Sequence, residues 1–402
     1  MKILVLAPQW PDPPRQGAAI RNLHILLYLA QRHDITLLTF TGTGAPLDTT
    51  RLGPVIRHEI FPLPARSRLD RLGTLLRTNE PDMAHRLRSR PMHDRVKELA
   101  LSGSYNAVHV EGIEMAPYGL LALENGVPSM TYDAHNAEYL LQRRAFTTDL
   151  RHAARFPKAI YSLVQWWRLR RMERALLGLS CHTLAVSEAD IKALARLEPN
   201  SSERLTLLPN GVDTEEWSLS ASYGRAEMPT DSVVFDGSMD FRPNVDAALW
   251  FAARVWPYVV EERTAARFFI VGRHPTPSVQ TLGKLSGITV TGAVEDPRPW
   301  VAGAAVYVVP MRMGGGVRLK LLQAMSMQRA IVSTPMGAEG VPVEHGQHVL
   351  IARSPQGFAR SVLDLLSERA RRDSLGLAAR ELVASRYAWP ILLPTLDRIY
   401  PV

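Results

Sequence analysis

Short apolar runs alternate with helix-like patterns in the first part of the chain. The run from Lys2 to Pro8 is almost wholly apolar and ends at a proline, which is typical of a strand buried on both faces of a parallel sheet. A helical pattern over 18–32 follows, and 34–40 is a second apolar run. The helix is expected to turn four residues toward the core: Ile20, Leu23, Leu27 and Ala30. This order predicts a βαβ unit, and further strands are predicted at 55–61, 106–110, 128–132 and 181–186.

The same alternation begins again near residue 232. Helices are predicted at 244–260 and 317–327, and strands at 233–237, 267–272, 288–291, 304–310 and 330–334. Between the two series lie an Asn-Gly turn signal at 210–211 and a polar stretch. The pattern predicts an α/β protein with a first domain over 1–210, a linker over 211–230 and a second domain over 231–385. Sheets of this kind bind ligands at the carboxyl ends of their strands, so the loops after the strands are examined for chemistry.

Composition narrows the class of protein. The 402 residues carry 47 Lys and Arg against 39 Asp and Glu, a net charge of +8, which indicates an anionic partner. The single cysteine, Cys181, excludes a disulfide framework and a cysteine-rich zinc site, and it favours a reducing compartment. No apolar run approaches the roughly 18 residues that a membrane span needs, and no secretory leader follows Met1. A cytoplasmic protein is therefore expected.

The segment from Pro310 to Met325 is the strongest candidate for a ligand site. A predicted strand ends at Pro310, three glycines follow, and a helix begins. Free backbone N–H groups and the positive dipole end at such a helix start bind anions such as a diphosphate. The alternative is a flexible loop before a surface helix. The residues of this segment that are predicted to bind this ligand are Gly314, Gly315, Gly316, Val317, Arg318, Lys320 and Gln323.

Several segments together resemble the retaining GT-B glycosyltransferases of family 4. They are Leu208-Pro-Asn-Gly-Val-Asp213, Val290-Thr-Gly-Ala-Val-Glu-Asp296, the Gly-Gly-Gly-x-Arg-Leu-Lys segment and Ser333-Thr-Pro-Met-Gly-Ala-Glu-Gly340. The resemblance implies two facing Rossmann-like domains, with an N-terminal acceptor domain and a C-terminal domain that holds a nucleotide-sugar donor. It implies no metal and no other cofactor. It also implies that the last helix, over about 376–400 and broken near Pro390, crosses back to the first domain, so that about 386–402 belong with that domain.

The chain departs from the family's pattern at three positions. The family usually has two glutamates separated by seven residues, and these align with Gly315 and Gln323. An amide at 323 keeps hydrogen bonds to the ribose hydroxyls but lacks the charge, so weaker nucleotide binding is expected. After the first strand of the second domain, the family has an arginine where this chain has Ser238. Arg242 is therefore expected to share the phosphate contacts with Arg318.

Three positions in the first domain are candidates for contact with substrate. Gly17 lies at the start of the first helix, in a loop that the family places beside the donor phosphates. His135 stands where the family carries an active-site histidine, and it is expected to contact the donor sugar; the alternative is a histidine that caps the next helix. Glu111 ends a strand and is a candidate for binding acceptor hydroxyls, with an ordinary loop carboxylate as the alternative. Asp133 could equally be structural.

Two residues of the second domain follow strands that the resemblance places near the nucleotide. Val294 is expected to cover the base, and Arg273 is expected to approach a phosphate or the base. The alternative for both is ordinary turn chemistry at the end of a strand.

The positive charge is concentrated in the segment 143–174. It holds nine arginines and lysines against two acidic residues, and it also carries aromatic residues that include Trp166 and Trp167. Arginine and tryptophan on amphipathic helices indicate contact with an anionic membrane surface, which would place the protein at the inner face of the membrane. The alternative is a solvated helical face. No nucleic-acid motif accompanies the charge, so nucleic-acid binding is not expected.

The residues and the resemblance together predict a glycosyltransferase that moves a sugar from a nucleotide-diphosphate sugar to a glycan or lipid-linked acceptor, with retention. The alternative is a weak or inactive GT-B protein that serves as a partner in a glycan-assembly complex. A nicotinamide-dependent dehydrogenase is disfavoured, because the first strand leads to Pro8-Gln-Trp-Pro11 rather than to a G-x-G-x-x-G turn.

Overall fold

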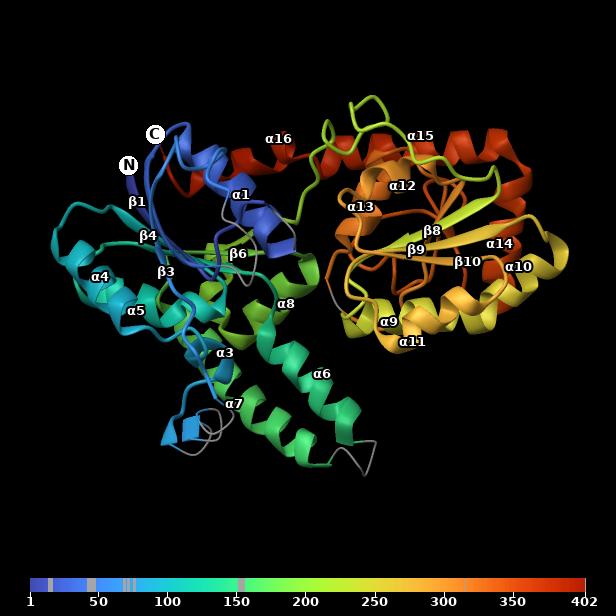
Figure 1. Cartoon of the computed structure of the whole chain (residues 1–402). Helices are drawn as coiled ribbons and strands as arrows, with labels where there is room; N and C mark the ends of the chain where they lie inside the picture. Colours follow the sequence, from blue (N-terminus) through green and yellow to red (C-terminus); the bar gives the residue numbers. More distant parts are fainter. Residues whose placement is uncertain are drawn as a thin grey trace. The chain divides into compact units, whose positions relative to one another are not determined.

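The computed structural model describes residues 1–13, 17–41, 48–67, 70, 73–74, 77–150, 156–314 and 316–401. The chain divides into two compact units (Figure 1). The first unit comprises Met1–Pro209 together with Leu393–Val402, and the second comprises Asn210–Leu392. Each unit is built on a sheet of its own. The predicted α/β class is confirmed.

The first unit contains a seven-stranded parallel sheet with the order β3-β2-β1-β4-β5-β6-β7. Ile3 of the first strand pairs with Ile35 on one side and with Ala107 on the other, so that strand is central and its side chains are almost entirely buried. Continuous apolar runs are what such doubly covered strands require. The strands are β1 (Lys2–Ala7), β2 (Asp34–Phe40), β3 (Arg57–Phe61), β4 (Ala107–Glu111), β5 (Met130–Ala134), β6 (His182–Ala185) and β7 (Leu205–Leu207).

Helix α1 (Gly17–Ala30) follows β1, but its buried face is not the one that the sequence predicts. Leu23 is buried as expected, whereas Ile20, Leu27 and Ala30 are only half-buried. The helix also buries Arg21 and Asn22, because both side chains find polar partners inside the unit. Because both residues are polar, the periodicity of apolar residues could not predict that they are buried.

The remaining helices of the first unit include a long antiparallel pair, α6 (Glu138–Leu150) and α7 (Phe156–Leu179), which extends beyond the sheet (Figure 1). No residue of α6 is buried. None of the helices in the described ranges has both the length and the apolar character needed to cross a membrane. The other helical segments are α3 (Asp82–His85), α4 (Arg90–Leu101), η1 (Ile113–Met115), α5 (Ala116–Glu124), α8 (Glu188–Leu197), η3 (Pro199–Arg204) and η6 (Leu393–Arg398).

The second unit contains a six-stranded parallel sheet with the order β10-β9-β8-β11-β12-β13. The strands are β8 (Ser232–Asp236), β9 (Arg267–Val271), β10 (Ile288–Gly292), β11 (Val306–Val309), β12 (Ile331–Ser333) and β13 (Leu350–Ile351). The helices are α9 (Arg242–Trp250), a π-helical turn η4 (Phe251–Val255), α10 (Trp256–Glu262), α11 (Pro277–Gln280), η5 (Thr281–Lys284), α12 (Arg298–Gly303), α13 (Leu319–Ser326), α14 (Pro355–Ser367), α15 (Arg369–Arg386) and α16 (Trp389–Leu392).

The segment 211–230, predicted as a linker, packs on the second unit. Its apolar side chains, among them Trp217 and Tyr223, lie against the core of that unit. Ser326 Oγ of α13 donates a hydrogen bond to the Trp217 carbonyl at 2.7 Å. The stretch is mostly polar and was therefore predicted as a linker, although a few large apolar residues attach it to the second unit.

The helical end of the chain, predicted to break near Pro390, consists of three segments. Helix α15 ends at Arg386, and the short α16 and the 3₁₀ turn η6 follow. The last residues return to the first unit, where Asp397 pairs with Arg32 of α1 at 2.5 Å and accepts a hydrogen bond from the Tyr28 hydroxyl at 3.0 Å.

Candidate functional site

In the first unit, three adjacent strands carry the candidate residues at their carboxyl ends. Strand β4 lies between β1 and β5, and its last residue, Glu111, is in register with Asp133 of β5. His135 follows β5 directly, and α1 follows β1 after a short loop. The parallel sheet therefore gathers side chains that are far apart in the sequence.

The carboxylate of Glu111 is completely buried and fully bonded. Oε1 lies 3.0 Å from His109 Nε2, and Oε2 lies 3.1 Å from His135 Nε2. The side-chain amide of Asn22, oriented so that its nitrogen donates, reaches Oε2 at 2.9 Å. Burial alone would raise the pKa of Glu111, but the two histidines outweigh it and hold that pKa below its ordinary value. Glu111 is therefore an anion without an exposed oxygen, which does not fit direct binding of acceptor hydroxyls; it orients His135 instead.

Asp133 forms a buried ion pair with Arg21 of α1. The guanidinium binds the carboxylate at both oxygens, at 2.7 Å from Nε and 2.9 Å from Nη2. Arg21 Nη1 also donates to the Leu208 carbonyl at 2.7 Å, close to the end of the first unit. Both side chains are almost completely excluded from solvent. The structural alternative for Asp133 is thus supported by its contacts.

His135 is the member of this group that reaches the surface, with a side chain that is 20% exposed. Burial favours the neutral imidazole, but the hydrogen bond to Glu111 and the charges of Asp133 and Glu111 raise the pKa of His135 above its ordinary value. The proposed alternative, a histidine that caps α6, does not match the bonding of that helix. Its first N–H groups are bound by Glu173 of α7, which accepts from Glu138 N at 2.9 Å and from Tyr139 N at 2.7 Å.

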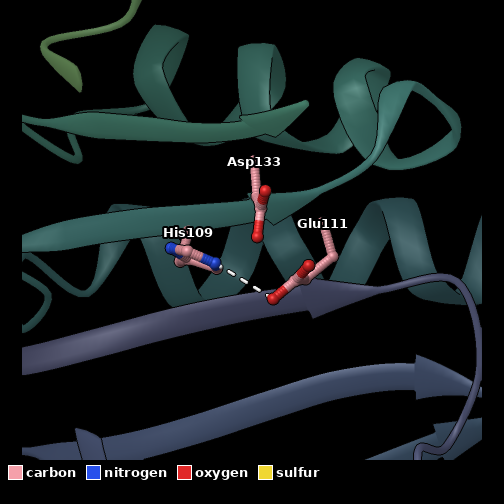
Figure 2. A group of neighbouring side chains, drawn as sticks. All are labelled: His109, Glu111 and Asp133. Atoms are coloured by element: carbon pink, nitrogen blue, oxygen red, sulfur yellow. Dashed lines mark hydrogen bonds and ion pairs between the residues drawn. The ribbon is translucent and has the colours of Figure 1, made fainter. Parts of the chain in front are cut away.

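Figure 2 shows His109, Glu111 and Asp133, whose potential ligand atoms lie within 4.8 Å of one another. We tested whether this group fits a metal ion. The oxygens of both carboxylates already accept hydrogen bonds from Arg21, His109 and His135, and His109 Nδ1 lies 2.7 Å from the Tyr400 hydroxyl. The donor atoms are thus committed to one another, so the group is better described as a network of hydrogen bonds and charges than as a metal site.

Gly17, the other candidate of the first unit, is the first residue of α1 and is half-buried. The next residue, Ala18, offers its carbonyl to Asn22 at 2.8 Å, which ties the helix start to the Glu111 network.

In the second unit, the loops after β8 and β9 approach each other at two glycines. Gly272 has φ +150°, and a Cβ added there would lie 1.8 Å from the Gly237 carbonyl oxygen. The side chain of Lys320, in α13, lies beside Gly237 at the meeting point of these loops. Its ammonium donates to the Asp236 carbonyl and to Asn244 Oδ1, the latter at 3.0 Å, and it lies 4.2 Å from the centroid of the Phe235 ring. Burial lowers the pKa of Lys320 to about 8.

The loop after β11 leads into the start of α13, the helix that carries Lys320. Gly314 has φ +116°, a conformation that residues with a side chain rarely adopt, and a Cβ there would lie 2.9 Å from Arg318 Nη2 and displace the guanidinium. Burial lowers the pKa of Arg318, and the charge of Glu339 partly offsets this effect. Gly316 and Val317 lead into the helix, and Val317 packs against Gly340. The predicted site residue Gly315 lies outside the described residues.

The other predicted donor-binding residues are more dispersed. Gln323 is half-buried in α13, one turn beyond Lys320, and Val294 packs against the core. Arg273 follows β9 and is half-buried, whereas Arg242 is the exposed first residue of α9. Within the described ranges, no hydrogen bond or ion pair joins Arg242 or Arg273 to Lys320 or Asn244. Asn244, which sequence reasoning missed, is the residue that connects the β8 loop to α13, since its Nδ2 also donates to the Ser238 carbonyl at 3.0 Å.

Two family models match the chain. The family described as Glycosyltransferase Family 4 matches residues 15–216, which is half of the chain, and the family described as Glycosyl transferases group 1 matches residues 230–368. Among curated proteins, an uncharacterized 44.6 kDa protein from the cps region of Klebsiella pneumoniae is 24% identical over 173 residues, 41% of this chain and 45% of that protein. An uncharacterized glycosyltransferase of Methanocaldococcus jannaschii is 29% identical over 119 residues, 29% of this chain and 30% of that protein. The chain thus matches less than half the length of each of these curated relatives.

Solved structures show the same fold over the whole length. Anabaena HepE, in complex with UDP and glucose, superposes with a TM-score of 0.68 at 13% identity and covers 99% of both chains. WaaG, a glycosyltransferase involved in lipopolysaccharide biosynthesis, gives a TM-score of 0.69 at 15% identity over all of both chains. Sucrose-phosphate synthase from Thermosynechococcus elongatus gives 0.70 at 16% identity, over 100% of this chain and 98% of that one. The two-domain GT-B fold expected from the sequence is confirmed.

Proposed function

Because the chain belongs to glycosyltransferase family 4, we propose that it transfers a sugar from a nucleotide-diphosphate sugar to a glycan or lipid-linked acceptor. One observation carries the proposal. In the second unit, Lys320, the start of α13 and the glycine loops after β8, β9 and β11 converge at the carboxyl ends of the strands. This is where α/β sheets bind phosphorylated ligands, and a buried ammonium beside free backbone N–H groups suits a diphosphate.

A nucleotide-sugar donor is supported by what similar proteins bind. HepE has been solved with UDP and with UDP-glucose. In this chain the donor would be held by Gly314, Gly315, Gly316, Val317, Arg318, Lys320 and Gln323, with Arg242, Arg273 and Val294 at its edges and Gly17 in the first unit. The cations Arg318 and Lys320 would stabilise the negative charge that develops on the leaving diphosphate, which is the part a metal plays in other transferases. We therefore propose transfer that needs no metal.

His135 is proposed to act at the reacting sugar. Its raised pKa keeps an N–H on the ring near neutral pH, so it can donate a hydrogen bond to a sugar hydroxyl. Glu111 serves this role indirectly by holding the ring. Because no exposed carboxylate accompanies His135 in the first-unit network, we propose that the leaving phosphate helps to deprotonate the acceptor and that configuration is retained.

A second function is favoured by two positions. Gly315 and Gln323 replace the two glutamates of the family's usual pattern, so the protein is alternatively a weak or inactive member that acts as a partner in a glycan-assembly complex.

We also propose that the α6–α7 pair contacts an anionic membrane at the inner, cytoplasmic face. On α7, Phe156, Ile160 and Trp167 are 51–57% exposed. Lys158 lies between the first two, and the Arg170 guanidinium lies 5.9 Å from the centroid of the Trp167 ring. Exposed aromatic and apolar side chains beside basic ones suit the headgroup region of a bilayer. Binding to phosphatidylglycerol vesicles should weaken several-fold in Trp167→Glu, whereas Leu285→Glu, at an exposed leucine of the second unit, should bind as wild type. Equal binding of all three proteins would contradict this surface.

The transferase proposal is tested by a screen of UDP-, GDP- and dTDP-sugars, read by thermal stabilisation and by release of the nucleotide. Stabilisation and turnover by one donor support an enzyme. Stabilisation without turnover against any glycan or lipid-linked acceptor supports the partner function. Failure of every nucleotide sugar to bind would contradict the transferase.

A further inference from the structure

A chain of hydrogen bonds connects the last residues of the protein to His135. The Tyr400 hydroxyl lies 2.7 Å from His109 Nδ1, His109 Nε2 lies 3.0 Å from Glu111 Oε1, and Glu111 Oε2 lies 3.1 Å from His135 Nε2. Tyr400 is 1% exposed, and His109 and Glu111 are not exposed at all. Only His135 opens to the surface, so the chain has one end from which substrate can be reached.

The direction of the hydrogen bonds follows from the charge of Glu111. Its carboxylate only accepts, so His109 and His135 each donate through Nε2. Burial raises the pKa of Tyr400, so its hydroxyl stays protonated and is able to donate to His109 Nδ1. In that arrangement His109 carries a single N–H, on Nε2.

The charge balance of the network leaves a place for one more proton. Glu111 from β4 and Asp133 from β5 carry two negative charges, and Arg21 from α1 carries one positive charge. Glu138 of α6 also acts on His135, and burial raises the pKa of this carboxyl. An uncompensated buried charge is costly, so one imidazolium is expected, and it is His135 if His109 carries a single N–H.

We propose that His109 and Tyr400 are positioning residues for His135, which hold Glu111 toward that ring and leave His135 as the imidazole that carries the proton. The Tyr400 hydroxyl occupies His109 Nδ1 and so prevents His109 from competing for the charge of Glu111. Within the described residues, no hydrogen bond is made to His135 Nδ1, so the protonated ring keeps an N–H that a substrate oxygen can accept. The role at the sugar rests on the proposed function, whereas the placement of the proton does not.

The test compares two tyrosines that both attach the C-terminal segment to the first unit. Tyr400→Phe removes the hydroxyl on His109, and Tyr28→Phe removes a hydroxyl that binds Asp397 of the same segment. In protein with ¹³C- and ¹⁵N-labelled histidine, the His135 signals are assigned with a His135→Gln variant and titrated by NMR. In Tyr400→Phe we expect the midpoint of His135 to fall and kcat to drop about tenfold with little change in the donor KM. Tyr28→Phe should titrate as wild type.

A second pair of variants covers the case in which a substitution disturbs folding. His109→Gln keeps an N–H donor for Glu111, and His109→Leu does not, so only the leucine variant should lower the His135 midpoint strongly. The proposal is overturned if His135 titrates identically in wild type, Tyr400→Phe and His109→Leu, or if Tyr28→Phe shifts it as much as Tyr400→Phe. If wild type transfers no sugar but Tyr400→Phe still shifts His135, the proposed function fails and the positioning role stands.

Discussion

The two units use polar groups at their strand ends in opposite ways. In the first, Arg21, Asp133, Glu111 and His109 bind one another, and nearly every donor and acceptor is consumed inside the protein. In the second, glycines at 237, 272 and 314 let the strand-end loops and the side chains of Lys320 and Arg318 approach closely, so that cations gather at the start of α13. The first arrangement fixes one histidine, and the second places cations where we propose that a donor phosphate binds. Substitutions in the first should therefore affect stability, and substitutions in the second should affect donor use.

The largest effect is expected at Arg21. Arg21→Met leaves the carboxylate of Asp133 buried without its partner, which should lower the free energy of unfolding by about 3–5 kcal/mol. Arg57→Met removes an ion pair with Asp34 in which both side chains are largely exposed, and it should cost less than about 1 kcal/mol. Urea denaturation measures both. Similar losses in the two variants would show that the buried pair is not special.

Lys320 should decide donor use with little effect on the fold. Lys320→Met is expected to lower kcat/KM for the donor by about 100-fold, since it removes a cation from the developing diphosphate charge. The wild-type pKa of about 8 adds a pH dependence: the ammonium is charged below pH 8 and neutral above it, so the donor KM should rise as the pH passes 8. Lys284→Met, at an exposed lysine of the same unit, serves as the control. Unchanged donor kinetics in Lys320→Met would remove this residue from the site.

Glu173 should give the first unit a stability that falls as the pH rises. Burial, aided by the charges of Glu138 and Asp190, raises its pKa to about 8, although two backbone N–H groups oppose this. The folded state therefore keeps a proton that the unfolded chain loses near pH 4.5, and stability declines between about pH 5 and 8. Thermal unfolding of Glu173→Gln should show a flatter dependence in that range. Glu98→Gln, at an exposed glutamate, should retain the wild-type slope, and parallel curves for all three proteins would contradict the assignment.

The smallest effect is expected at Gln323. Gln323→Glu restores the charge that the family's usual pattern places on the ribose hydroxyls, and a charge-assisted hydrogen bond is worth about 1 kcal/mol more than a neutral one. Donor affinity should rise a few-fold by calorimetry, with no change in Gln347→Glu. A loss of affinity would indicate that Gln323 faces a group that only an amide can bind.

The strands and the glycine loop of the second unit were predictable because their signals are local. A buried parallel strand is a run of apolar residues, and a tight phosphate loop needs glycine, so 34–40 and 314–316 can be recognised from adjacent letters. Strands β7 and β13 were missed because each has two or three residues, too few for a pattern.

The network of the first unit was predictable only in part. Glu111 and His135 could be singled out because they lie at strand ends. The role of Glu111 depends on His109 and Asn22, two polar residues that the sequence gives no reason to place in the interior. Arg21 and Asp133 are separated by 112 positions, and His109 and Tyr400 by 291. Such pairs meet only when the sheet and the returning C-terminal segment have formed. No local signal could have assigned them.

The return of residues 393–402 to the first unit constrains how this protein can be recombined with its relatives. A chimera that takes residues 1–209 from this chain and everything after them from another protein would lose Asp397 and Tyr400, and with them the bonds to Arg32, Tyr28 and His109. The part of the chain to exchange is therefore discontinuous: a chimera that takes the first 209 residues from this protein should also take its last ten. Libraries that cut the chain once are expected to yield fewer active hybrids than libraries that cut it twice.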